Sequence, residues 1–310
     1  MKRNIGLVFV LLNVFSGSIF AQQMINKTGY LFDSFQINPA FAGFNDAISA
    51  TSMLRKAWTG VRNSPQNAYF GLDLPISGKR AGLGFQFLDE RQEVSKAYGA
   101  QLTYSYRIQI GQNSTFSMGW QTGLFYYSVN YTLLDVIDPN DPMFTQEASG
   151  NKLNFGTGFF FYSPKFYIGL SSPNFIRNKR NYIISADVTN LITESRQVYL
   201  HIGLNMSLSD DMRFKPSVLV RAPQGMDITY DLNANLSFLN TLNFGLSYRE
   251  RRAVVALVYM KLHQNFHLGY SHELNTSRFS TIMRSVHEIM LRYQIPVGGN
   301  FQVLKTNFYC

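Results

Sequence analysis

Apolar and polar residues alternate with a period of two along most of this chain. From Tyr98 to Ile110 every even-numbered residue is apolar or aromatic, while the odd-numbered residues are Gly, Gln, Thr, Ser or Arg. Residues 198–208 and 228–238 repeat the pattern. Successive side chains of a β-strand point to opposite faces, so each segment predicts a strand with one apolar and one polar face.

Segments of this kind recur along the whole chain after its first fifty residues. They predict fourteen strands, and an even number is typical of single-chain bacterial outer-membrane barrels. The approximate ranges are 47–57, 66–74, 80–88, 97–110, 114–128, 152–162, 165–171, 197–208, 213–221, 226–238, 241–249, 252–262, 265–273 and 284–295.

The connections between these segments differ in length according to their order. After even-numbered segments they are short: 75–79, 111–113, 163–164, 209–211, 239–240 and 263–264. After odd-numbered segments several are long: 58–65, 89–96, 129–151, 172–196 and 274–283. Short periplasmic turns and longer extracellular loops are the usual asymmetry of outer-membrane barrels. On this pattern both termini are periplasmic.

The apolar face is too aromatic to remain in water as one open sheet. In lipid every backbone donor and acceptor needs a partner, so the sheet must also close. A soluble β-sandwich, which hides its apolar faces against each other, is the competing architecture, and Pro216 inside the ninth segment counts against a regular ladder there. We predict an all-β, single-chain transmembrane antiparallel β-barrel over residues 47–295.

Residues 22–46 before the barrel and 296–310 after it are predicted to be a periplasmic N-terminal segment and a periplasmic tail, and either could plug the lumen from below. Residues 1–21 are predicted to be a signal peptide, because Lys2 and Arg3 precede the apolar stretch 5–12 and Ala21 precedes polar residues. The single cysteine, Cys310, cannot form an internal disulfide.

Composition supports a barrel and excludes two other classes. Charged residues make up 15% of the chain, whereas soluble globular proteins have roughly 25%. No apolar run reaches the roughly 20 residues of a transmembrane helix, which excludes a helical membrane protein. The many aromatic residues, 15% of the chain, exclude a disordered one. The net charge is +9, but an exported barrel is not expected to meet nucleic acid.

Several charged side chains fall on the polar face, which points into the predicted lumen. They are Arg107, Arg221, Asp227, Asp231, Arg249, Glu288 and Arg292. One interpretation is a selective channel with opposed charges, and the other is a salt-bridged network that fills the interior. A barrel of eight strands leaves no channel and one of sixteen leaves a channel. A strand number of fourteen therefore does not distinguish the two interpretations, and we favour the network.

The sequence offers little support for catalysis, and we expect neither an enzyme nor a cofactor or metal. The histidines show no metal-binding spacing: His263 and His267 straddle a predicted turn. A nucleophile motif such as GxSxG is missing. The oxygen-rich stretch Asp138–Pro142 could bind calcium, but Asx-Pro sequences also initiate turns for local reasons, and we interpret it as a turn.

Four stretches resemble the PorP/SprF family, in family order. Residues 37–43, INPAFAG, resemble its NPAYAG signature, although Phe41 replaces the usual tyrosine. Residues 135–144 resemble its DPxDPxF loop, residues 170–174 a GLSxxN-type strand end, and residues 215–221 a PSxLxR strand. The motif positions are Asn38, Pro39, Gly43, Asp138, Pro139, Asp141 and Pro142. They are candidates either for partner binding or for structural turns, and we favour turns.

This resemblance implies an outer-membrane barrel associated with type IX secretion, which helps export or anchor surface proteins. The expected partners are outer-membrane lipids together with a secreted surface protein, or periplasmic or lipoprotein components of a secretion complex. Two other functions stay open: a structural barrel subunit of another outer-membrane machine, and a channel for small solutes.

Overall fold

The computed structural model describes residues 28–58, 61, 63–76, 80–133, 147–175, 179–185, 188–193, 196–250, 252–276 and 285–297. The predicted signal peptide and the loop that holds Asp138, Pro139, Asp141 and Pro142 lie outside the described residues, as does nearly all of the predicted tail.

All fourteen predicted strands are present. Their bounds lie within three residues of the predicted ones, except that β3 ends four residues later and β6 begins five residues earlier. One predicted strand is divided at Asn205 into β10 and the short β11. The strands are β1 Ala47–Ala57, β2 Gln66–Ile76, β3 Ala81–Gln92, β4 Ser95–Ile110, β5 Ser114–Asn130, β6 Glu147–Tyr162, β7 Phe166–Asn174, β10 Gln197–Leu204, β11 Met206–Ser207, β12 Met212–Pro223, β13 Thr229–Phe238, β14 Leu242–Arg249, β15 Ala253–Lys261, β16 Phe266–Asn275 and β17 Ser285–Pro296.

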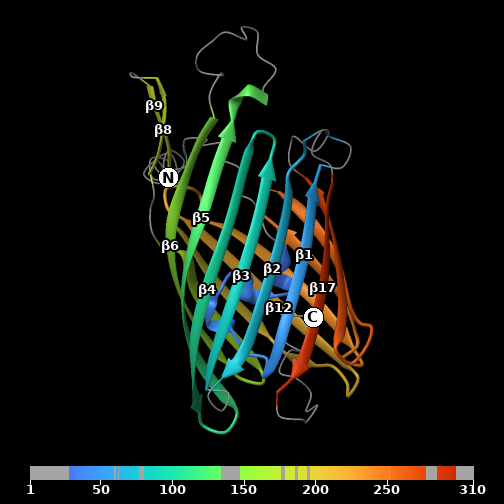
Figure 1. The fold of residues 1–310 in the computed structure, drawn as a ribbon. Helices are drawn as coiled ribbons and strands as arrows, with labels where there is room; N and C mark the ends of the chain where they lie inside the picture. The colour runs from blue at the N-terminus through green and yellow to red at the C-terminus, as the bar shows by residue number, and fades with distance from the viewer. Residues whose placement is uncertain are drawn as a thin grey trace, which may run out of the picture.

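The strands form one closed antiparallel barrel (Figure 1). Barrel strands adjacent in the sequence pair with each other, and β1 closes the sheet against β17 with Met53 opposite Met290. On the far side β10 pairs with both β7 and β12. The ladder continues through Pro216, which lies opposite Ala234. The prediction of a fourteen-stranded antiparallel barrel is therefore confirmed.

One predicted loop is wrong. The connection predicted at residues 89–96 is a two-residue turn of Glu93 and Val94, because β3 continues to Gln92 and β4 begins at Ser95. Glu93 adopts the left-handed conformation that such a turn needs, with φ 49°. Residues 89–96 are polar on both faces, so the period of two disappears there although the hydrogen-bonded ladder continues.

The barrel is consequently taller on one side. β4, β5 and β6 have 16, 17 and 16 residues, against 8 in β14 and 9 in β15. Figure 1 shows the taller strands rising at the end that carries the longer connections. The segment predicted as a loop at 172–196 contains a separate hairpin, β8 Lys179–Ser185 with β9 Val188–Thr193.

The outer surface is apolar, as a lipid-facing surface must be. Leu54, Leu102 and Leu246 are each more than 60% exposed, and many aromatic side chains face outward beside them. None of the helices among the described residues is long and apolar enough to cross a membrane.

The hydrophobic core lies inside the barrel, around the chain that precedes β1. Residues 28–46, which we call the plug, contain three short 3₁₀ helices: η2 Gly29–Leu31, η3 Ser34–Gln36 and η4 Pro39–Phe41. Every residue from Thr28 to Phe44 except Gln36 is buried. The plug is visible in blue within the barrel in Figure 1.

A charge on the outer face tests the lipid environment. Leu246 is 61% exposed near the middle of β14. Leu246→Arg should therefore destabilise the barrel in a bilayer, lowering its free energy of unfolding by about 2–4 kcal/mol. Leu246→Phe serves as the matched apolar control and should have little effect. The measurement is urea-dependent refolding into liposomes, and equal stability of the two variants would contradict a lipid-facing position.

Candidate functional site: the plugged lumen

The plug runs along the lumen between the two ends of the barrel. At the end with the short turns, Asp46 lies 3.6 Å from Arg107, three residues before β4 ends. At the other extreme, the Thr28 hydroxyl lies 3.4 Å from the guanidinium of Arg249, the last residue of β14. Thr28 therefore lies towards the end of the barrel that carries the longer connections.

Inward-facing side chains from five strands donate hydrogen bonds to backbone carbonyls of the plug. A buried carbonyl without a partner costs about 1–3 kcal/mol, so these donors make the plug compatible with a dry interior. The pairs are Arg292 to Phe32 at 2.7 Å, Gln86 to Phe35 at 2.6 Å, Ser171 to Ile37 at 2.7 Å, Ser117 to Ala40 at 2.7 Å and Ser105 to Ala42 at 2.7 Å.

The INPAFAG motif forms the lower part of the plug. The Asn38 side chain caps η4 by accepting from the Ala40 amide at 2.9 Å, and its amide nitrogen donates to the Phe159 carbonyl at 3.0 Å. Pro39 begins η4, where its fixed φ suits a helix start. Gly43 has φ 62° and donates its N–H to Asp73 at 2.8 Å. These contacts are all internal to the barrel.

The wall approaches this motif closely. A Cβ atom on Gly158 would lie 2.0 Å from Oδ1 of Asn38, so β6 can pass the plug only with glycine there. Beside it the Phe160 ring packs on two plug rings, with centroids 4.1 Å from Phe41 and 5.1 Å from Phe44. Aromatic pairs of this kind contribute roughly 0.5–1.5 kcal/mol each beyond their buried area.

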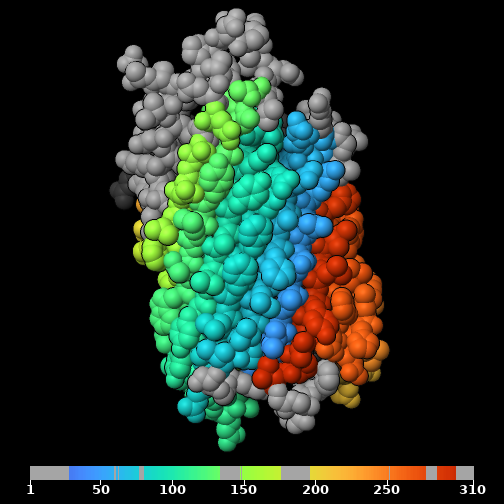
Figure 2. Space-filling model, in the orientation of Figure 1, coloured from blue at the N-terminus to red at the C-terminus, as the bar shows by residue number. Residues whose placement is uncertain are grey.

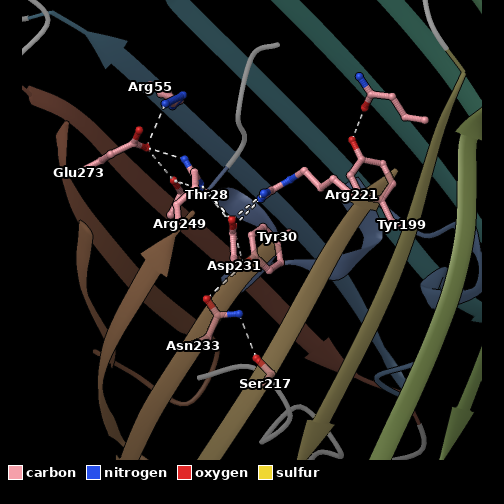
Figure 3. Close-up of polar contacts among 11 residues, drawn as sticks. Thr28, Tyr30, Arg55, Tyr199, Ser217, Arg221, Asp231, Asn233, Arg249 and Glu273 are labelled. Atoms are coloured by element: carbon pink, nitrogen blue, oxygen red, sulfur yellow. Dashed lines mark hydrogen bonds and ion pairs between the residues drawn. The ribbon is translucent and has the colours of Figure 1, made fainter. Parts of the chain in front are cut away.

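A cluster of charges surrounds the upper part of the plug (Figure 3). Arg221 on β12 binds both oxygens of Asp231 on β13, at 2.6 and 2.5 Å. Arg249 lies 3.3 Å from Asp231 and 2.9 Å from Glu273 on β16. Glu273 also accepts from Arg55 on β1 at 3.2 Å. The cluster therefore joins strands from both sides of the β1–β17 closure.

The plug completes this cluster. The Tyr30 hydroxyl lies 3.0 Å from Asp231 and 3.2 Å from Asn233. The Thr28 hydroxyl donates to Glu273 at 3.3 Å. Figure 3 shows both plug side chains among the charged groups. The charges are thus paired with each other and with the plug, instead of lining an open path.

Six of the seven predicted lumen residues, all except Asp227, point inward and are buried. The structure brings together Arg221, Asp231 and Arg249, and Glu288 lies 3.8 Å from Arg55 at the edge of the same cluster. Arg107 and Arg292 lie apart from it and contact the plug.

One predicted lumen position is wrong, and four residues of the cluster were missed. Asp227, predicted to face the lumen, is exposed in the β12–β13 connection, so that prediction is wrong. Arg55 and Glu273 were missed, although both occupy inward positions of predicted strands. Thr28 and Tyr30 could not be found, because no periodicity places residues of the plug.

Two of the five histidines, His201 and His267, act as structural partners of tyrosines. His201 and His267 are buried and lie 3.1 and 2.7 Å from the hydroxyls of Tyr167 and Tyr259. Within the residues that the structure describes, no group of three or more His, Cys, Asp or Glu side chains is placed to hold a metal ion.

Little space remains between the plug and the wall beside it. A cavity of about 30 Å³ lies between Gln36 and the wall residues Met53, Tyr69 and Glu288. Such a volume has room for one or two water molecules.

Comparisons with known proteins agree with the barrel. The model of one family, Type IX secretion system membrane protein PorP/SprF, matches residues 19–293. No curated protein matches the sequence. The CymD monoaromatic hydrocarbon channel is similar in structure, with a TM-score of 0.52 and 9% identity over 88% of this chain and 94% of that chain.

Two further solved structures are more distant. They are a Pseudomonas aeruginosa FadL homologue, with a TM-score of 0.48 and 11% identity, and the Ralstonia pickettii toluene transporter TbuX, with a TM-score of 0.48 and 10% identity. Each covers 87% of this chain and 94% of its own. The similarity to CymD supports the fold alone. The closed barrel and the family match together indicate an outer-membrane protein.

Removing the shared carboxylate should destabilise the barrel. Asp231→Ala leaves the buried guanidinium groups of Arg221 and Arg249 without their common partner, which should cost about 3–5 kcal/mol of unfolding free energy. The control, Asp211→Ala, removes an exposed carboxylate from the β11–β12 turn. Urea unfolding in detergent micelles measures both, and an Asp231→Ala variant as stable as the control would contradict the network.

A larger residue at the closest approach of wall and plug should also cost stability. Gly158→Val forces Asn38 or β6 to move, at about 1–3 kcal/mol. Gly150→Val changes the same strand at a position where a Cβ meets nothing within 4 Å. Thermal unfolding should separate the two variants, and equal melting temperatures would show that Asn38 does not lie against Gly158.

Proposed function

This chain belongs to the PorP/SprF family of type IX secretion system membrane proteins, and we propose that it is a non-enzymatic barrel subunit of a secretion-associated complex. In this role it holds a surface protein or helps its export. The observation that carries the proposal is the filled lumen, in which residues 28–44 are buried apart from Gln36. A barrel filled by its own chain is suited to be a rigid scaffold.

The barrel offers such a scaffold, with its longer connections gathered at one end. The taller wall of β3–β6 and the longer connections lie at the same end, and connections held by a rigid sheet commonly carry binding sites. The partners we propose are a secreted surface protein, or periplasmic or lipoprotein components of the complex. The internal contacts of Asn38, Pro39 and Gly43 favour a structural role for that motif.

Affinity isolation from native membranes in mild detergent tests this function. The expected result is co-isolation of a surface protein or of components of the secretion machinery. Recovery of the chain alone would contradict the proposal. Recovery with the components of a different outer-membrane machine would favour the alternative of a structural subunit there.

A channel for small solutes is the other alternative. It requires a path through the lumen, whereas the plug and the paired charges of Arg221, Asp231 and Arg249 occupy the described interior. We therefore expect the purified barrel to be silent in planar bilayers. Single-channel currents that change when Arg221 or Arg249 is neutralised would favour the channel instead.

We propose that the end with the short turns is periplasmic. β1 begins and β17 ends there, which agrees with the predicted periplasmic position of the tail after Pro296. The N-terminal side differs from the prediction of a periplasmic segment, because the plug runs back through the lumen to Thr28. Thr28, the first described residue, lies towards the end that we propose to be extracellular.

Cysteine labelling tests this orientation. In a Cys310→Ala background, Glu93→Cys at the end of the longer connections should react with a membrane-impermeant maleimide on intact cells. Asp211→Cys, in an exposed short turn, should react only after the outer membrane is permeabilised. Labelling of Asp211→Cys on intact cells would contradict the proposed orientation.

A further inference from the structure

The outward face of the barrel carries very few positive charges. Among the barrel strands that the structure describes, only three lysine or arginine side chains occupy outward positions: Lys56 on β1, Arg91 on β3 and Lys96 on β4. All three are exposed. The other outward positions of these strands are mainly apolar, so charge on the lipid-facing wall is concentrated on neighbouring strands.

These three residues lie in one row of directly paired positions. Lys56 is opposite Gln66, Gln66 is opposite Arg91, and Arg91 is opposite Lys96. On the other side of Lys56 the row continues to His287 on β17. With neighbouring strands about 4.8 Å apart, the row from His287 to Lys96 is about 19 Å long. We call it the basic row.

A groove of about 400 Å³ lies along the basic row, on the wall that faces the viewer in Figure 2. Its polar edge includes Lys56, Gln66, Arg91 and His287, together with the carboxylate of Asp89. Its apolar floor lies two residues further towards the short-turn end and consists of Leu54, Ala68 and Ile289. The small Ala68 side chain leaves the floor open between its larger neighbours.

The Arg91 side chain is held in place at this groove. Asp89, on the same face of β3, accepts from its Nε at 3.0 Å and from its terminal nitrogen at 2.7 Å. A two-point contact fixes the plane of the guanidinium. Tyr98 also forms a side-chain hydrogen bond with Arg91. The N–H groups that Asp89 and Tyr98 leave over can be offered to a ligand at little cost in side-chain entropy.

We infer that the groove binds the phosphorylated headgroup of a membrane lipid, with an acyl chain on the apolar floor. Two features select this occupant. The cations of the basic row complement a phosphate, and basic clusters at the membrane surface attract anionic lipids. The apolar residues directly beside them face the hydrocarbon region, where the chain of the same lipid lies. A soluble phosphate would contact the cations of the basic row but would leave the apolar floor uncovered.

Native mass spectrometry of the detergent-solubilised barrel tests the site, with dioleoyl phosphatidic acid or dioleoyl phosphatidylcholine added. The wild-type chain should retain phosphatidic acid in preference. The double variant Lys56→Gln, Arg91→Gln should retain it about 10-fold less. The control, Arg80→Gln with Lys165→Gln, removes the same charge from exposed side chains at the short-turn end and should behave as wild type.

A second variant separates a lipid from free phosphate. Ala68→Phe fills the apolar floor without changing charge, so it should lower retention of phosphatidic acid, and millimolar inorganic phosphate should not displace the lipid. Equal retention by the Lys56, Arg91 variant and its control would overturn the site. So would equal retention of the two lipids. Full displacement by inorganic phosphate would overturn the lipid as occupant.

Discussion

The structure depends on pairing the polar inner face of a closed barrel with the chain's own residues. A fourteen-stranded sheet that turns its apolar side chains to lipid must turn its polar ones inward, and fourteen strands enclose more space than the wall side chains fill by themselves. Here the chain fills that space with its own residues 28–46. Wall side chains such as Gln86 and Ser117 donate to the plug carbonyls at 2.6–2.7 Å, so wall and plug satisfy each other.

The same constraint explains the buried charges. Ionised side chains removed from water are costly unless they are paired, and in this lumen Asp231 is shared by Arg221, Arg249 and the hydroxyl of Tyr30. The plug hydroxyls of Thr28 and Tyr30 complete this cluster. Loss of the plug would also take the carboxylates of Asp33 and Asp46 away from Arg292 and Arg107. A fixed interior of this kind favours the role of a scaffold over that of a permanently open channel.

The sequence predicts the barrel well because one physical pattern, alternation between lipid and lumen, acts on every strand. Arg221 and Asp231 could be placed inside for the same reason. The pattern fails where its cause is absent: residues 89–96 are polar on both faces, so the continuation of β3 and β4 was missed. Tyr30 and the plug follow no period, because their positions are set by contacts distant in the sequence, and only the structure could show that they complete the cluster.

The most direct measurement of the central claim is hydrogen–deuterium exchange over residues 30–44 in the folded barrel. If the plug is bonded to the wall, its buried amides should exchange as slowly as those of central barrel strands such as β4. Exchange at the rate of an unstructured peptide, beside slow exchange in β4, would show that the lumen is not filled by the plug and would contradict the account.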